Sequence, residues 1–270
     1  MMDIEDHRIS QCWQGMSPNC GGALIDPSLL VMHFTASGGK DPSGDIDWFM
    51  SPAAKAAAHF TVGRNGAIKQ VVPLNIKAWH AGRSIWRGKP NCNDYSIGIE
   101  IDNWGKLAKT ADGQMRSYTG APVDPSGAAL LQHKHETSPC YWELYPQAQL
   151  DSAAGLVRLI LAHYPSIGEI VGHDDIAPGR KVDPGPAFPM SRFVSLVAGR
   201  GDVALAKRTV MASSLNARGG AGTNFDILGQ FSRGTKVIIL YDVPGAWAQV
   251  KGKLDNGKDV IAWVADQYLA

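Results

Sequence analysis

An alternation of side chains in SLLVMHFTAS predicts a β-strand near residue 30. Leu30, Met32 and Phe34 share one face of this strand, and His33 lies on the other. Open α/β sheets place their ligand clefts at the carboxyl ends of strands. A histidine near the end of an apolar strand is therefore a candidate for chemistry.

Two further stretches predict strands. AHFTVGRNGAIKQVVPL contains two β-rich runs joined at Asn65 and Gly66, a strong hairpin signal because both turn positions tolerate positive φ. In YSIGIEIDNWG the isoleucines share one face, and Ser96, Gly98 and Glu100 share the other. The two small residues are expected to leave room above the sheet for a substrate.

Helical patterns alternate with these strands. LDSAAGLVRLILAHYP predicts a helix capped by Asp151 and ended by Pro165, and FPMSRFVSLVAG predicts a second helix. IGEIVGH between them predicts a short strand. Residues 105–145 are rich in glycine, proline and polar residues and predict loops and short strands. The order predicts an α/β fold, a mixed central β-sheet flanked by helices.

The pattern becomes all-β after about residue 200. Short apolar runs separated by GGAGTN, VPGA and LDNGKD predict a small all-β barrel. We expect an α/β domain over residues 1–200, a linker over 201–207 and the barrel over 208–270.

Composition narrows the function classes. The chain has 270 residues, 44% hydrophobic and 19% charged, which is ordinary for a globular protein. Its net charge of +1 gives no reason to expect nucleic acid, and no apolar run reaches the roughly 18–20 residues of a membrane span. The N-terminal stretch lacks an apolar secretory segment, so we expect synthesis in the cytoplasm without a signal peptide. The spacing of the four cysteines favours free thiols, with a Cys12–Cys20 disulfide as the alternative.

The stretch VGHDDIAPGRKVDPGPAFP carries His173, Lys181 and Asp183 on a segment whose prolines and glycines favour an irregular loop. Catalytic zinc sites gather three nitrogen, sulfur or carboxylate ligands and leave a fourth position open. His33, His173 and Asp183 could form such a set, but spacing alone favours ordinary core or loop roles for each. Glu100 is harder to dismiss, because a carboxylate in an apolar strand is costly unless it is paired or faces a cleft.

Five motifs in order resemble one enzyme family: VMHFTAS, AHFTVGRNGAIKQVVPL, AWHAG, NDYSIGIEIDNWG and GHDDIAPGRKVDPGP. Over residues 20–200 the chain resembles the zinc-dependent N-acetylmuramoyl-L-alanine amidases of amidase type 2. The resemblance implies that His33, His173 and Asp183 bind Zn²⁺. It implies that Glu100 transfers the proton and that Lys181 stabilises the oxyanion during cleavage of the bond between N-acetylmuramic acid and L-alanine.

Four other residues are candidates for substrate binding, each with a structural alternative. His80 in AWHAG contacts substrate or makes a structural hydrogen bond, and Trp79 lines the cleft or the core. Asn93 and Arg180 hold either ligands or loops.

The C-terminal pattern resembles a bacterial SH3-like domain, commonly a cell-wall-binding module. Its aromatic residues Trp247, Trp263 and Tyr268 lie where barrel core and rim are expected, and core is favoured over glycan stacking.

Three functions fit these observations. The first is an amidase that cuts polymeric peptidoglycan, as a phage lysin or antibacterial effector acting on the cell wall after release or dedicated delivery. The second is a cytosolic amidase that recycles anhydro-muropeptides. The third is a protein that binds muropeptides without cutting them. The complete ligand set favours an enzyme, and a wall-binding domain favours the polymer.

Overall fold

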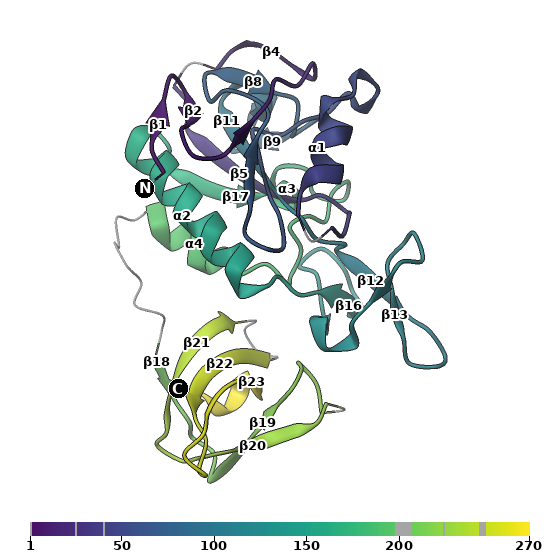
Figure 1. Cartoon of the computed structure of the whole chain (residues 1–270), viewed down its shortest axis with the longest axis vertical. Coiled ribbons are helices and arrows are strands. Elements are labelled where there is room, and N and C mark those ends of the chain that lie inside the picture. Colours follow the sequence, from purple (N-terminus) through teal and green to yellow (C-terminus); the bar gives the residue numbers. More distant parts are fainter. Residues whose placement is uncertain (1, 25, 40, 198–206, 224, 243–246) are drawn as a thin grey trace. The chain divides into compact units, whose positions relative to one another are not determined.

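The computed structural model describes residues 2–24, 26–39, 41–197, 207–223, 225–242 and 247–270 (Figure 1). The chain divides into two compact units, each described here by itself. The first comprises Met1–Gly105, Tyr145–Gly185 and Met190–Gly199, and the second comprises Lys106–Leu144, Pro186–Pro189 and Arg200–Ala270. Apart from Lys207, the predicted linker lies outside the described residues. The predicted domain boundaries therefore stay predictions.

A six-stranded mixed sheet forms the centre of the first unit, in the order β17-β5-β11-β6-β7-β3. Its strands are β3 (Trp13–Gln14), β5 (Leu29–Phe34), β6 (Phe60–Val62), β7 (Ile68–Gln70), β11 (Ser96–Ile101) and β17 (Glu169–Gly172). Strand β5 lies between β17 and β11 and is parallel to both. Strands β6 and β7 form the predicted antiparallel hairpin, and Gly66 takes the positive φ of +84° in its turn. The predicted mixed sheet is confirmed.

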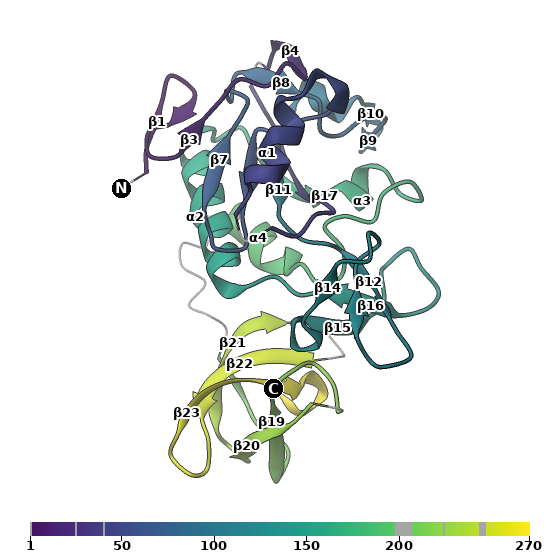
Figure 2. The ribbon, with the colours of Figure 1, turned by 45° about the vertical axis from the view of Figure 1, so that its right-hand side comes forward.

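Helices lie on both sides of this sheet (Figures 1 and 2). α2 (Gln147–His163) and α4 (Met190–Val197) cover the apolar face, and α1 (Ser43–Met50) lies on the other side. The prediction that Asp151 caps α2 is wrong, because the helix begins four residues earlier, after Pro146. The buried Gln149 amide holds this extra turn by donating to the carbonyls of Val62 and Asp102, each at 2.9 Å. No helix in the described part of the chain is long and apolar enough to cross a membrane.

Short elements complete the first unit. They are β1 (Ile4–Glu5), β2 (Arg8–Ile9), β4 (Cys20–Ala23), η1 (Pro52–Ala54), β8 (Ile76–Ala78), β9 (Ile85–Trp86), β10 (Lys89–Pro90), η2 (Cys92–Asp94) and α3 (His173–Ile176). The one-turn helix α3 lies where an irregular loop was predicted. A hydrogen bond of 2.8 Å from the Gly172 N–H to the Asp175 carboxylate closes this turn. The four cysteines are free.

The second unit contains two sheets. The predicted short strands of 105–145 form a five-stranded antiparallel sheet from β12 (Lys106–Lys109), β13 (Met115–Arg116), β14 (Pro122–Val123), β15 (Ala128–Leu131) and β16 (Cys140–Glu143), with η3 (Pro125–Gly127). The all-β C-terminal part has the strand order β18-β21-β22-β23-β19-β20. Its elements are β18 (Lys207–Thr209), β19 (Ser214–Arg218), β20 (Ile227–Ser232), β21 (Lys236–Asp242), β22 (Trp247–Lys253), β23 (Asp259–Ala265) and η4 (Asp266–Tyr268).

The aromatic residues of the C-terminal part divide between core and surface. Trp263 is 5% exposed, and Phe231 is fully buried. Tyr268 is 43% exposed and, with the partly exposed Trp247, lines a recess of about 340 Å³. A core position therefore holds for Trp263 but not for Tyr268.

We expect Gly98→Ala to destabilise the protein by about 1–3 kcal/mol, as overpacked cores do. A Cβ at this position would lie 2.4 Å from Cγ of His80, a buried residue. Urea unfolding measures the effect.

Gly155→Ala in α2 is the matched control, because nothing lies within 4 Å of its added Cβ. A helical Gly→Ala exchange leaves stability unchanged or raises it by up to about 1 kcal/mol. Equal stabilities of the two variants would contradict the close packing of His80 on Gly98.

Candidate metal centre and active site

The register of the parallel strands assembles the site on one face of the sheet. His33 of β5 lies opposite Glu100 of β11, which lies opposite Thr61 of β6. On the other side of β5, Gly172 of β17 lies opposite Met32, so the chain enters α3 at His173 beside His33. One imidazole from β5, one from the first residue of α3 and a carboxyl group from β11 thus meet near the carboxyl ends of parallel strands.

The three predicted metal ligands meet in the structure. Nδ1 of His33 lies 2.9 Å from Nδ1 of His173, and Oδ2 of Asp183 lies 3.1 Å and 2.9 Å from these two atoms. A backbone hydrogen bond of 2.9 Å from Asp174 to the Asp183 carbonyl folds the loop back toward α3. All three side chains are buried, and their ligand atoms lie within 4.8 Å of one another. Two imidazoles and one carboxylate are a donor set that fits a metal ion with one further position open.

The electrostatics of His33 and Asp183 suit a cation. Burial lowers the pKa of His33 to about 4, and the neighbouring His173 adds to this effect. The imidazole of His33 is therefore neutral at pH 7. Burial alone would raise the pKa of Asp183, but the neighbouring His173 and His33 hold this pKa well below its usual range. The carboxylate is therefore ionised beside a neutral imidazole, as metal binding requires.

Glu100 and Lys181, the two predicted catalytic residues, lie near this centre. Burial raises the pKa of Glu100 well above its usual range, the charges of Asp183 and Asp45 raise it further, and Lys181 opposes them. Oε2 of Glu100 is buried and has no hydrogen-bond partner among the described residues. A carboxyl group with a raised pKa and an unpaired oxygen is suited to taking up and returning a proton.

His80 occupies the space in which a substrate was expected. Its ring packs over Gly98, Nδ1 lies 2.9 Å from Nε2 of His33, and Nε2 lies 3.2 Å from Oγ of Ser96. Burial, followed by the neighbouring His33, His59 and His173, lowers the pKa of His80 well below its usual range. The expectation that Ser96 and Gly98 leave an open space is therefore wrong, because a side chain from another segment fills it.

Asn93 and Arg180 both fasten the segment that follows Trp79. Oδ1 of Asn93 accepts from the backbone N–H groups of His80 and Ala81, at 3.2 Å and 2.8 Å. Nη2 of Arg180 donates to the carbonyls of Ala81 and Arg83, at 2.9 Å and 2.7 Å. Their predicted contacts with substrate stay a prediction.

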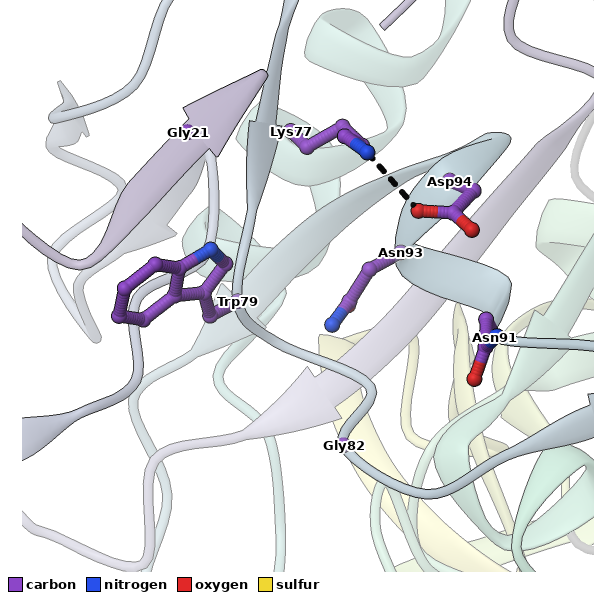
Figure 3. A pocket seen from close by; sticks show the side chains of 7 residues that line it. All are labelled: Gly21, Lys77, Trp79, Gly82, Asn91, Asn93 and Asp94. Carbon is purple, nitrogen blue, oxygen red and sulfur yellow. Dashed lines mark hydrogen bonds and ion pairs between the residues drawn. The ribbon is translucent and has the colours of Figure 1, made fainter. Parts of the chain in front are cut away.

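Trp79 is 42% exposed and lines a recess of about 260 Å³ (Figure 3). Asn93 and Asn91 also line this recess, as do Lys77 and Asp94, whose side chains are joined by an ion pair of 3.1 Å. The recess combines an aromatic ring with amide and charged groups.

Sequence reasoning missed two contacts that act on the ligands. Ser96 bonds to His80, and the Ala81 carbonyl lies 3.1 Å from Nε2 of His173. The position of Ser96 on the face of Glu100 was a usable signal. A backbone carbonyl leaves no such signal.

Known protein families match both parts of the chain. The family described as N-acetylmuramoyl-L-alanine amidase matches residues 24–186, and the bacterial SH3 domain matches residues 213–270. The chain therefore belongs to the N-acetylmuramoyl-L-alanine amidase family, and it is an amidase with a C-terminal SH3-like domain.

Individual relatives agree with this assignment. The chain is 32% identical to the 1,6-anhydro-N-acetylmuramyl-L-alanine amidase AmpD of Salmonella typhimurium (strain SL1344), over 64% of this chain and 81% of the relative. It is 34% identical to the N-acetylmuramoyl-L-alanine amidase AmiD of Escherichia coli (strain K12), over 61% of this chain and 51% of the relative. A crystal structure of an AmpD derivative superposes with a TM-score of 0.51 at 27% identity, covering 72% of this chain and 98% of the other.

We expect the metal-free protein to lose stability as the pH falls from 6.5 toward 4. His59 is fully buried, its Nδ1 accepts from the Gly98 N–H, and its Nε2 bonds to the Ile76 carbonyl. Burial lowers the pKa of His59 from 6.5 to about 4. In this window the unfolded chain binds a proton that the folded chain excludes, so acid favours unfolding by up to about 1.4 kcal/mol per pH unit for this group.

Urea unfolding between pH 7 and pH 5 measures this slope. His59→Asn retains an acceptor for the Gly98 N–H and removes the titrating ring. The free energy of unfolding of this variant is therefore expected to depend less steeply on pH, by an amount that corresponds to the uptake of up to one proton. A slope equal to that of the unsubstituted protein would contradict the assignment to His59.

Proposed function

We propose that this chain is a zinc-dependent amidase that hydrolyses the bond between N-acetylmuramic acid and L-alanine in polymeric peptidoglycan. The observation that carries the proposal is the convergence of His33, His173 and Asp183 beside Glu100. Membership of the amidase family indicates which bond is cut, and the two imidazoles and one carboxylate favour zinc as the metal.

His33, His173 and Asp183 would hold the zinc ion. When bound, the ion supplies Lewis-acid polarisation of the amide carbonyl and makes water a better nucleophile. Glu100 accepts the proton of the attacking water and delivers it to the leaving nitrogen of L-alanine, a sequence that its raised pKa favours. Lys181 stabilises the negative charge that develops on the carbonyl oxygen.

The recess beside Trp79 is the proposed substrate contact outside the reacting bond. The exposed face of the indole offers an apolar surface, and Asn93 and Arg180 hold the segment on which it lies. His80 belongs to the same segment, and its contacts favour the structural alternative over direct contact with substrate.

The SH3-like domain favours polymer over soluble fragments as the substrate. Its recess presents Trp247 and Tyr268 beside polar groups, a combination suited to cell-wall material. Action on the polymer places the protein at the cell wall, after release or dedicated delivery. The second candidate is cleavage of 1,6-anhydro-muropeptides, which the name of the AmpD relative favours.

We expect Glu100→Gln to retain zinc and to lose about 100- to 10,000-fold in kcat, the usual contribution of general acid–base catalysis. The amide keeps the shape of the carboxyl group but cannot take up the proton. Zinc content by elemental analysis and turnover of a purified muropeptide measure the two properties.

Two controls separate the roles. His33→Ala is expected to lose both zinc and turnover, and Trp79→Ala is expected to raise KM with little change in kcat. A near-native rate for Glu100→Gln would exclude Glu100 as the base.

Removal of the C-terminal domain tests the choice of substrate. We expect a 1–200 truncation to lose activity on intact sacculi while its activity on soluble muropeptides stays close to that of the full chain. Both proteins are assayed side by side on sacculi and on purified anhydro-muropeptides. Faster cleavage of anhydro-muropeptides by the full chain, with no effect of truncation on sacculi, would favour the recycling function.

A further inference from the structure

One dipeptide contacts both imidazoles of the candidate metal centre from behind. Nδ1 of His80 lies 2.9 Å from Nε2 of His33, and the Ala81 carbonyl oxygen lies 3.1 Å from Nε2 of His173. Asn93 holds both backbone N–H groups of this dipeptide through one oxygen. The contacts involve the ring nitrogens that point away from Asp183.

The direction of the hydrogen bonds at His33 follows from a series of hydrogen bonds that begins at the Cys92 carbonyl and passes through Ser96 and His80. The Cys92 carbonyl can only accept, so Oγ of Ser96 donates to it at 2.6 Å. The hydroxyl of Ser96 therefore accepts from the Nε2–H of His80. An imidazole tautomer has one N–H, and that of His80 is used on Ser96, so Nδ1 of His80 carries the lone pair and accepts from the Nε2–H of His33. Nδ1 of His33 is then left with a lone pair toward Asp183.

Donors and acceptors at His173 are assigned in the same way. Its Nε2 lies near the Ala81 carbonyl and also 3.4 Å from Nη2 of Arg180. Both hydrogens of this Nη2 are used at shorter distances, on the carbonyls of Ala81 and Arg83. Nε2 of His173 is therefore the donor, to Ala81, and its Nδ1 also carries a lone pair toward Asp183.

We propose that His80 and Ala81 are positioning residues that fix the tautomers of His33 and His173, so that both Nδ1 lone pairs face Oδ2 of Asp183. This inference rests on the metal-binding role in the proposed function. It explains a feature of the site: three atoms with lone pairs meet within 3.1 Å, an arrangement that a cation stabilises. It also explains two positions of the SIGIE stretch, since Ser96 orients His80 and Gly98 leaves room for its ring.

The test compares two substitutions of similar size at His80. In His80→Asn, Oδ1 can accept from the Nε2–H of His33, whereas His80→Leu fills the space without an acceptor. We expect His80→Leu to bind zinc about 10- to 100-fold more weakly, as is usual for loss of an outer-shell partner, and His80→Asn to recover most of the loss. Competition with a chromophoric chelator measures the affinity, and circular dichroism confirms folding. Equal affinities of the two variants would overturn the proposal in favour of simple packing.

A second measurement is independent of zinc and of catalysis. In the zinc-free full chain, ¹⁵N shifts of the imidazole rings report which nitrogen carries the proton. We expect His33 and His173 to be protonated at Nε2, and His33 to become a mixture of tautomers in His80→Leu. Protonation of His33 at Nδ1 in the unsubstituted protein would overturn the proposal. If the proposed function were wrong instead, the result would be different. Zinc binding or turnover would be absent, while His33 and His173 in the zinc-free protein would still be protonated at Nε2.

Ser96→Ala tests the hydrogen bond that orients His80 within this series of hydrogen bonds. Ser17→Ala is its matched control, because Ser17 is also buried and donates to a backbone carbonyl, that of Phe49 at 2.5 Å. Only Ser96→Ala is expected to weaken zinc binding and to broaden the His33 signals. Similar zinc affinities and His33 spectra for the two variants would exclude Ser96 from the chain that orients His33.

Discussion

The parallel register of β5 against its two neighbours is the constraint on which the site depends. It places His33 beside Glu100 on one side and brings the chain to His173 on the other. Side chains alternate along a strand, so a slip of one residue would turn His33 to the opposite face and Met32 to this one. The fully buried side chains of Leu30, Met32 and Ile99 specify the register, because a slip of one residue would turn them to the face that carries the site. Packing on one face therefore fixes chemistry on the other.

The two carboxyl groups of the site have their pKa values moved in opposite directions. The neighbouring His173 and His33 hold the pKa of Asp183 low, whereas burial raises the pKa of Glu100, and Oε2 of Glu100 has no hydrogen-bond partner in the described part of the chain. Groups whose environments separate their pKa values in this way divide into ligand and proton carrier. The charge on Asp183 itself contributes to the rise at Glu100. The pKa values of the two carboxyl groups are thus coupled through space.

Local pattern predicted the strands, the hairpin at Gly66 and the second helix, because alternation and turn chemistry are properties of neighbouring residues. It predicted the start of α2 wrongly, because Gln149 finds its partners on strands far away in sequence. The meeting of His33, His173 and Asp183 was implied by family motifs rather than by spacing. The filling of the space over Gly98 by His80 was missed, because no local signal says which distant side chain occupies a gap.

The residues of the site differ in their exposure to solvent. His33, His173 and His80 are buried, and the segment that carries His80 is fastened to the loop of Asp183 through Arg180. Glu100 and Lys181 are partly exposed. Under the proposed mechanism, the substrate approaches from the side of Glu100 and Lys181, where a proton carrier and a cation are needed. In the proposed arrangement, His80 and Ala81 lie behind the ligands and set the direction in which the Nδ1 lone pairs of His33 and His173 point.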